Sequence, residues 1–351
     1  MDILNKIERF FANISKQLSE RPVLTFFLFG LVIASIGFLP HTGLIRWGTM
    51  GIFAYIIIFS VVAMGLNLLL GFSGLISLGT AGFVGAGALG LGVFMNMGIP
   101  FEIAAVLVLI ISGLLGALIG LFSLKVEGIY LAIATLFVGE ILRQIYTQVE
   151  IFGGQAIRIG SVRFLGFIEL SMINQMQRSF LFLIITGFMV VMMVVMHNIV
   201  KSKTGRALMA MSRSQHAAQA MGISLLKYRL TAFVLATLFA TFGGVMYGLY
   251  NQNVPTTAWT LDLSLFVIAM VIVGGLKSIY GTFLGVFIIY GIPNLWLKNY
   301  FGDISYIFSG ILIILVIIFY PHGFVYIWYD LKKQYNRLKA YLSQKQVTQD
   351  E

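Results

Sequence analysis

Apolar residues fill most of this chain in long runs that only short polar breaks interrupt, from Val23 to Tyr320. A helix of about 20 mostly apolar residues crosses the roughly 30 Å hydrocarbon core of a bilayer. The pattern therefore predicts an all-α, polytopic transmembrane helical bundle of about ten spans. The predicted spans lie near residues 23–40, 50–70, 75–97, 102–123, 129–147, 180–199, 230–250, 262–275, 280–297 and 304–320.

Basic residues predict how these spans are oriented. Lys and Arg concentrate at the N-terminus, at Lys125, between residues 201 and 229, and after Asp330. Cytoplasmic loops carry an excess of Lys and Arg, so an even number of spans must separate successive basic regions. The predicted spans meet this condition, which places both termini and the 201–229 loop in the cytoplasm and the loop from Gln148 to Arg178 outside.

The two ends of the chain differ from its apolar body. Residues 1–22 predict an amphipathic helix lying in the headgroup region, although a frayed polar tail is the alternative. Residues 23–329 form the predicted transmembrane domain, and residues 330–351 a polar cytoplasmic tail. The apolar positions of the N-terminal helix are Ile3, Leu4, Ile7, Phe10, Phe11, Ile14 and Leu18, opposite Lys6, Glu8, Arg9 and Lys16.

Composition supports lipid as the solvent and removes several functions. Charged residues make up 10% of the chain and hydrophobic ones 59%, with a mean hydropathy of +0.95. The net charge of +10 is explained by the predicted cytoplasmic loops, so no nucleic acid is expected as a partner. Cysteine is absent and the four histidines are scattered, so neither a metal site nor a cofactor is expected.

Glycine and small polar residues mark a candidate transport path. Many of the 38 glycines lie inside apolar segments, where they permit close helix packing or a break in a helix beside a cavity. The run GFSGLISLGT from Gly71 to Thr80 adds hydroxyl groups to such a segment. The alternative for each polar candidate named below is a structural hydrogen bond between helices, with no part in the path. The candidate path residues are Asn67, Ser73, Ser77, Thr80, Tyr130 and Thr135.

The chain lacks the chemistry to drive transport by itself. It contains no Gly-rich phosphate-binding loop, and the predicted outer links leave no room for a soluble enzyme domain. No catalytic residues are predicted. Charged residues within spans are few, and Glu140 and Arg143 are spaced to pair on one helix face. This pair is either a structural ion pair or a gate.

The loop from Lys201 to Arg229 is the most distinctive cytoplasmic feature. Its sequence predicts a helix from about Gly205 to Ala220 that stops at Gly222. We expect this helix to lie along the membrane and to present Ala217, Ala218 and Met221 outward, either toward the cytoplasm or toward lipid. It is either a plain loop helix or a socket for a soluble motor subunit.

Four blocks of sequence resemble those of a known transporter family. His216-Ala217-Ala218 followed after three residues by Gly222 is similar to the Glu-Ala-Ala-x-x-x-Gly coupling motif of ATP-binding-cassette importer permeases. Together with three other blocks in the same order, it resembles bacterial branched-chain amino acid permeases, specifically the longer of the two permease subunits. The blocks lie at residues 65–83, 128–143, 217–223 and 274–285.

This resemblance implies a function, partners and a place in the cell. It implies a permease subunit of the bacterial inner membrane that imports Leu, Ile and Val and has the fold of vitamin B12-type importers. It also implies a second permease subunit as heterodimer partner, two ATP-binding-cassette subunits that hydrolyse ATP, and a periplasmic binding protein. The residues expected to contact the ATPase are Arg206, Arg213, His216, Ala217, Ala218, Met221 and Gly222.

Three departures from the family pattern leave the cargo open. His216 replaces the usual acidic residue, Thr80 stands where His or Gln is common, and Thr282 replaces a common Pro. One alternative is the same machine carrying urea, short amides or another small solute. Another alternative is a stand-alone facilitator, which would not need the coupling helix.

Overall fold

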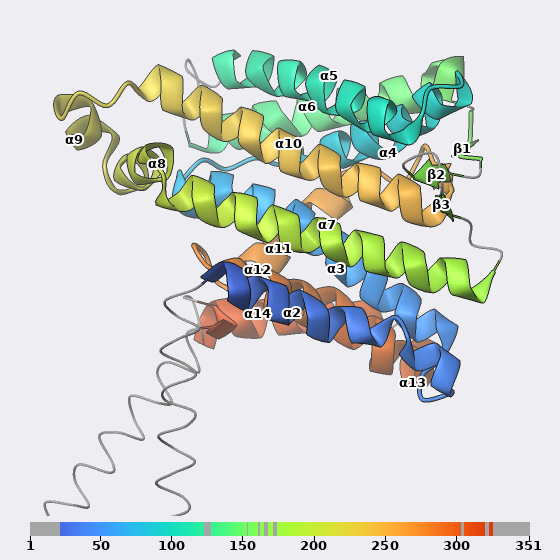
Figure 1. The fold of residues 1–351 in the computed structure, drawn as a ribbon. Helices are drawn as coiled ribbons and strands as arrows, with labels where there is room; N and C mark the ends of the chain where they lie inside the picture. Colours follow the sequence, from blue (N-terminus) through green and yellow to red (C-terminus); the bar gives the residue numbers. More distant parts are fainter. Residues whose placement is uncertain are drawn as a thin grey trace, which may run out of the picture.

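The chain folds into a bundle of helices (Figure 1). The computed structural model describes residues 22–122, 128–152, 154–160, 162–164, 168–170, 174–302, 305–319 and 323–325 of the 351. The predicted N-terminal interfacial helix lies outside these residues except for Pro22, and so do Lys125 and the 330–351 tail.

The first half of the bundle begins with α2 (Pro22–Ile36) and the short η1 (Leu39–Thr42). Next, α3 (Trp47–Asn67) continues into one wider π-helical turn, η2 (Leu68–Phe72), before the chain leaves the helix. The remaining elements are α4 (Thr80–Asn96), α5 (Phe101–Phe122), α6 (Ile129–Gln148), η3 (Glu150–Phe152) and α7 (Gln175–Lys201).

The second half begins with two short helices, α8 (Lys203–Arg213) and α9 (Gln215–Ala220), and then the long α10 (Leu225–Asn251). A second interrupted pair follows, α11 (Leu261–Gly274) and α12 (Ile279–Val286). The last elements are η4 (Phe287–Gly291), η5 (Pro293–Leu297), α13 (Lys298–Phe301) and α14 (Ser305–Phe319).

Short strands are an addition to the predicted all-α fold. β1 (Ala156–Arg158) pairs antiparallel with β4 (Asn253–Pro255), and β2 (Val162–Phe164) pairs antiparallel with β3 (Ile168–Leu170). Each strand has only three residues. Hydropathy did not predict them, because strands this short carry no periodic pattern.

Seven helical segments in the described part of the chain are long and apolar enough to cross a membrane. α4, α11 and α14 are apolar but shorter, with 17, 14 and 15 residues. These segments overlap the predicted spans, and the multi-pass helical character of the fold is as predicted, with seven of the segments long enough to cross a membrane. The seven long segments are Pro22–Thr42, Trp47–Phe72, Phe101–Phe122, Ile129–Gln148, Gln175–Lys201, Leu225–Asn251 and Ile279–Leu297.

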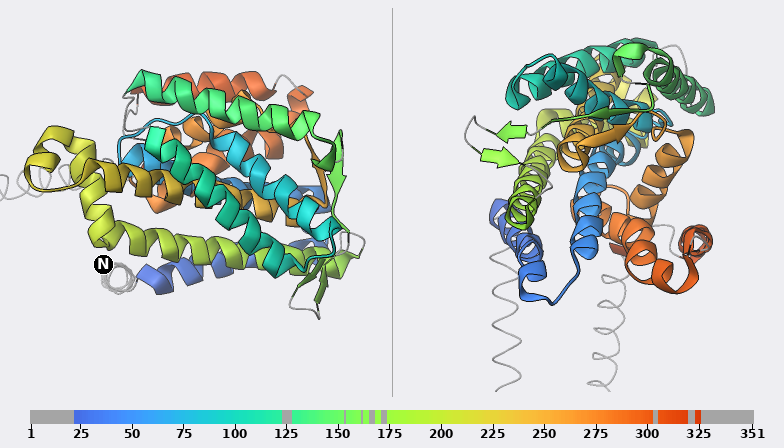
Figure 2. Two further views of the ribbon diagram at one scale, coloured as in Figure 1. Left: turned by 90° about the horizontal axis from the view of Figure 1, so that it is seen from above. Right: turned by 90° about the vertical axis from the view of Figure 1, so that its right-hand side faces the viewer.

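The long helices run roughly along one direction, with different elements at the two ends of the bundle. Figure 1 shows α8 and α9 at one end and β1, β2 and β3 at the other. Figure 2 shows the same separation from above. We call these the α9 end and the strand end.

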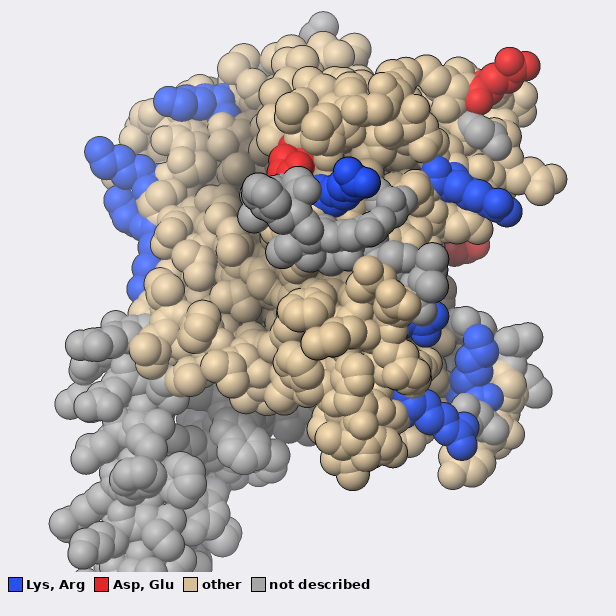
Figure 3. Space-filling model, turned by 45° about the vertical axis from the view of Figure 1, so that its right-hand side comes forward, with Lys and Arg blue, Asp and Glu red and all other residues tan. Residues whose placement is uncertain are grey.

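The outer surface of the bundle is apolar, as a lipid-facing surface must be. Figure 3 shows one face, on which most of the surface is uncharged. Leu114 on α5 is 64% exposed, and Phe137 on α6 and Ile314 on α14 are similarly exposed. Exposed apolar side chains of this kind would be unfavourable in water but are favourable against acyl chains.

The core forms around α10, which packs against α4, α5 and α3. The backbones of α4 and α10 come into contact at two glycines. A Cβ atom on Gly87 would overlap the carbonyl oxygen of Thr241, and one on Gly244 would overlap the carbonyl oxygen of Val84. In lipid, helices associate through such close packing, since burial from water supplies no force between them.

We predict that Gly244→Val destabilises the bundle by about 1–3 kcal/mol, because the added side chain forces α4 and α10 apart. The measurement is the thermal midpoint of the detergent-solubilised protein. The matched control is Gly187→Val on α7, where a Cβ meets nothing within 4 Å. An equal midpoint for the two variants would contradict the close-packing explanation.

Candidate functional site

The chain leaves helical geometry between η2 and α4, inside the bundle. Side chains from other helices satisfy the backbone groups that this break releases. The Leu78 N–H donates to Thr135 Oγ1 over 2.9 Å, and the Ala81 N–H donates to Ser264 Oγ over 3.0 Å. Non-helical backbone at membrane depth is stable only where protein surrounds it, which is the situation here.

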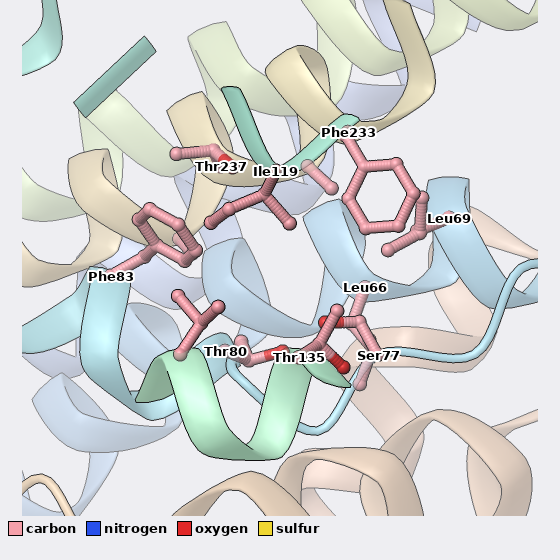
Figure 4. A pocket seen from close by; sticks show the side chains of 12 residues that line it. Leu66, Leu69, Ser77, Thr80, Phe83, Ile119, Thr135, Phe233 and Thr237 are labelled. Carbon is pink, nitrogen blue, oxygen red and sulfur yellow. The ribbon is translucent and has the colours of Figure 1, made fainter. Parts of the chain in front are cut away.

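Three of the six candidate path residues line one pocket. Figure 4 shows Ser77, Thr80 and Thr135 around a space whose other lining side chains are apolar except for Thr237. The space available to the centre of a water molecule is about 20 Å³, so the pocket has room for roughly one water. The other lining residues are Leu66, Leu69, Phe83, Ile119, Val138, Phe233, Ala236, Thr237 and Ala240.

Thr237 is a polar pocket residue that the sequence analysis missed. It lies on α10 and is 4% exposed. The signal that could have identified it is a hydroxyl residue within the apolar run of a predicted span. That signal is weak, because a threonine within a helix can also bond to its own helix backbone.

The remaining candidate path residues lie elsewhere. Ser73 is buried and donates from Oγ to the Leu69 carbonyl over 2.5 Å, within its own turn. Tyr130 is 75% exposed near the start of α6. Neither residue lines the pocket of Figure 4, and neither does Asn67.

Asn67 connects the two interrupted helix pairs. Its side chain is fully buried, its Nδ2 donates to the Ser278 carbonyl over 3.1 Å, and its Oδ1 accepts from the Lys277 N–H over 2.9 Å. Lys277 has a positive φ of 65°, a conformation that is uncommon for a residue other than glycine. Asn67 therefore fixes the break between α11 and α12 against the end of α3.

Glu140 and Arg143 pair on one face of α6. Arg143 donates from Nε over 2.9 Å and from Nη2 over 2.5 Å to the two carboxylate oxygens, and Gln144 adds a third bond over 3.1 Å. The side chains are 25% exposed for Arg143 and 41% for Glu140. The bidentate geometry satisfies both charges and orients the carboxylate.

The loop at the α9 end forms two helices, so the prediction of one helix from Gly205 to Ala220 was wrong. Ser214 adopts an extended conformation and caps α9 by accepting from the Ala217 N–H over 3.3 Å. A serine bonds readily to nearby backbone N–H groups, which favours a new helix start over continuation. The predicted stop is present, since Gly222 follows α9 with a φ of 81°.

Most of the residues predicted to contact an ATPase lie on the surface at this end. Ala218 is instead 4% exposed, contrary to the expectation that it faces outward. A face of α9 must pack on the bundle to hold this short helix, and Ala218 lies on that face. The exposed residues are Arg206, Arg213, His216, Ala217, Met221 and Gly222.

The helix α8 contacts both helix breaks. A Cβ on Gly74 would lie 3.3 Å from the Ser212 Cα, and Lys277 Nζ lies 3.5 Å from Ser212 Oγ. The opposite face of α8 carries the exposed Arg206 and Arg213. A displacement of α8 would therefore act directly on the two breaks.

No group of His, Cys, Asp and Glu side chains suited to a metal occurs among the described residues.

Comparison with known proteins gives one family and several relatives. Residues 48–317 match the family described as the permease component of the branched-chain amino acid transport system. The chain is 27% identical over 318 residues to the high-affinity branched-chain amino acid transport system permease protein LivM of Escherichia coli, covering 85% of this chain and 74% of that protein. No solved structure matches significantly.

Two archaeal relatives carry different names. Over 239 residues the chain is 27% identical to the probable branched-chain amino acid transport permease protein LivM of Methanocaldococcus jannaschii, covering 64% of this chain and 67% of that protein. Over 142 residues it is 32% identical to the probable permease protein LivH of the same organism, covering 38% of this chain and 44% of that protein.

We predict that Asn67→Ala lowers stability by about 1–3 kcal/mol, because it removes the two hydrogen bonds that Asn67 makes to the backbone of Lys277 and Ser278. The thermal midpoint of the solubilised protein measures the loss. Asn96→Ala is the matched control, since Asn96 is exposed at the end of α4. An unchanged midpoint in the Asn67 variant would show that the break holds without this side chain.

We also predict that Thr135→Val slows transport several-fold, while Thr135→Ser retains most of the activity. Valine has the shape of threonine but cannot accept from the Leu78 N–H, whereas serine keeps the hydroxyl. The measurement is the initial rate of solute uptake into vesicles at matched protein levels. Equal uptake rates for the two variants would show that transport does not depend on this hydrogen bond.

Proposed function

We propose that this chain, which belongs to the permease component family of branched-chain amino acid transport systems, forms half of the membrane path of an ATP-driven importer. The chain is a multi-pass membrane transport protein, and its proposed cargo is leucine, isoleucine and valine. ATP hydrolysis is assigned to separate ATP-binding-cassette subunits, because the sequence contains no phosphate-binding loop.

The proposed assembly contains a second, similar permease, two ATP-binding-cassette subunits and a periplasmic binding protein. The similarity of one chain to both LivM and LivH proteins supports a pair of related permeases. The longer coverage of the LivM relatives supports assignment of this chain as the longer subunit.

The proposed topology has ten spans in the bacterial inner membrane, with both termini in the cytoplasm and an overall fold of the vitamin B12-type importers. In this topology the three shorter helices α4, α11 and α14 are membrane spans in addition to the seven long segments. The short α4 and α11 border the two breaks, where protein replaces lipid as the surrounding medium, so they need not span the full hydrocarbon thickness.

The observation that carries the ATP-driven mechanism is the exposed α9 beside α8. Met221 is 83% exposed, and a Cβ on Gly222 would meet nothing within 4 Å. A stand-alone facilitator has no use for an exposed helix pair that also contacts the helix breaks. A soluble subunit that docks here would displace α8. The contacts of Ser212 would then transmit that displacement to the two helix breaks.

The pocket of Figure 4 supports an apolar cargo. Its lining is aliphatic and aromatic apart from a few hydroxyl groups, as suits a branched hydrocarbon side chain. Because it has room for roughly one water, this pocket would have to widen to admit such a side chain.

We predict that Ala217→Trp abolishes leucine-stimulated ATP hydrolysis by the assembled transporter in nanodiscs with its binding protein. The exposed Ala217 contributes to the proposed docking surface, and tryptophan there would block close approach of another subunit. Ala217 is preferred over Gly222 for this test, since the positive φ of Gly222 would strain any replacement.

Leu114→Trp is the matched control, because it adds bulk at an exposed position on α5 within the bilayer. The control should retain stimulated hydrolysis, and the Ala217 variant should also fail to co-purify with the ATPase. A wild-type chain that associates with no ATPase would refute the importer and leave the facilitator.

A further inference from the structure

The helix α6 carries charged side chains at a depth where a span that faces lipid is apolar. Glu140 lies eight residues before Gln148, where α6 ends. The rise of an α-helix places its backbone about 12 Å from that end. In the proposed topology this end of α6 lies at the outer surface of a hydrocarbon core that is roughly 30 Å thick. Glu140 is therefore close to the middle of the membrane.

Glu140 begins a row of polar residues, which we call the polar stripe. Its members are spaced by three and four residues, which places them on one face of the helix. None of them is buried, since Gln144 is exposed and the others are partly exposed. The stripe thus reaches from the middle of the membrane toward the outer end of α6. The members are Glu140, Arg143, Gln144 and Thr147.

A second row on α6, the apolar stripe, has the composition that lipid requires. Its members recur every four residues and lie beside the polar stripe on the helix surface. Phe137 is 60% exposed and Ile141 is 58% exposed, which is favourable against acyl chains. The two stripes are both accessible but differ in chemistry, so they require different surroundings. The members of the apolar stripe are Ile133, Phe137, Ile141 and Ile145.

Lipid cannot provide the surroundings that the polar stripe requires. Arg143 neutralises Glu140 through two hydrogen bonds, but both side chains stay partly exposed, and acyl chains offer them no further hydrogen bond. An arginine can extend toward the headgroups, whereas the Arg143 guanidinium is held at Glu140. Ionisable side chains within spans almost always face a protein interior or a water-filled cavity. The polar stripe therefore requires water or another protein beside it.

Water has room beside this stripe. A hollow lies between α4, α6 and α11, with Leu136, Gly139 and Glu140 as its α6 wall. The space available to the centre of a water molecule is about 220 Å³, so several waters fit next to Glu140. Thr135 and Val138 of the same helix line the pocket of Figure 4, so α6 borders both spaces.

The helix α6 is also in close contact with the first helix break. A Cβ on Gly79, just before α4, would lie 2.5 Å from the Thr135 carbonyl oxygen, and one on Gly139 would lie 3.1 Å from the Gly79 Cα. Backbones packed this closely transmit displacement, because there is no free space between them. A movement of the break would therefore move α6 and its polar stripe.

We infer that the polar stripe faces the water-filled path of the importer and that the second permease closes this path from the opposite side. The inference rests on the proposed function and names the face at which the two permeases meet. A second permease is the fitting partner, because a path formed between two similar chains needs an exposed polar surface on each of them within the membrane. Glu140 and Arg143 then supply a polar wall, and since their charges cancel they hold no ion there.

The test exploits the absence of cysteine from the chain, since a single introduced cysteine reports on one position. The assembled transporter in nanodiscs is treated with a sulfonate-bearing methanethiosulfonate, which is charged and stays in water. This reagent reacts with the thiolate, a form that cysteine adopts in water and not among acyl chains. The labelled fraction over time gives the reaction rate at each position.

Neighbouring residues supply controls at almost the same depth. We expect Gln144→Cys to react at least about tenfold faster than Ile145→Cys, and Leu136→Cys at least about tenfold faster than Phe137→Cys. Phe137 and Ile145 are exposed in this chain, so a slow reaction there reports the absence of water and not burial within the chain. Thr147→Cys, with the same expectation, replaces Gln144→Cys if that variant fails to assemble. Equal rates within either pair overturn the inference.

Photo-crosslinking identifies the partner across the path. The photoreactive residue p-benzoyl-L-phenylalanine at position 144 should crosslink this chain to the second permease. The same residue at position 27 on α2, which lies on the far side of the bundle from α6, should not (Figures 1 and 2). Phe27 is 62% exposed, so both positions are accessible. The absence of a permease crosslink from position 144, or equal crosslinking from both positions, overturns the assignment of this face.

ATP hydrolysis stimulated by leucine-loaded binding protein, measured in the same nanodiscs, separates this inference from the proposed function. A stimulated transporter with equal labelling within the pairs overturns the placement of the path alone. A chain that is never stimulated and recovers neither a second permease nor an ATPase overturns the importer, and the inference with it.

Discussion

The backbones of α4 and α10 touch at Gly87 and Gly244, and the bundle is arranged around that contact. In lipid, apolar side chains gain nothing by leaving their surroundings for a protein core, so dispersion forces at close range must hold helices together. Glycine permits the closest approach, because it removes the atoms that would keep two helices apart. The same arrangement recurs where Gly274 meets the backbone of α12 at Gly281. The high glycine content is therefore a requirement of the solvent.

The two breaks in helical geometry are possible because this packed core surrounds them. Each break exposes backbone groups that lipid could not satisfy, and each is satisfied by a side chain from a distant part of the sequence. Thr135 supports the first break, while Asn67 supports the second from the end of α3. The two breaks are also held to each other, because Gly71 lies against the backbone of Lys277. Stability and the candidate path thus depend on the same few polar side chains.

The sequence predicted the helices well and the side-chain contacts poorly. Hydropathy located all ten apolar segments, since each is long compared with the error in its ends, and the four motif blocks predicted the family that the comparisons confirm. The small strands were missed because pairing partners such as Ile157 and Val254 lie far apart in the chain. The break at Ser214 was missed because a serine is compatible with either continuation or a new cap.

The candidate path residues show the same limit. Local composition identified Ser77, Thr80 and Thr135, which share one pocket, but it could not separate them from Asn67, whose partners lie about 210 residues away. Thr237 was missed in the sequence, since only the fold shows that it lines the same pocket. Which side chains line a pocket depends on three-dimensional neighbours, and a hydrophobicity pattern carries no record of them.

The division of α8 into two faces has an evolutionary consequence. Its inner face, with Leu208 and Met211, is buried, and Ser212 contacts the helix breaks, so substitutions there disturb the permease itself. Its outer face carries the exposed Lys203 and Arg206, where substitutions can accumulate without that cost. Duplicated transporters in one cell could diverge on the outer face until each permease accepts only its own motor. Surface substitutions alone can thus prevent a permease from pairing with the ATPase of a paralogous transporter, while the translocation path stays unchanged.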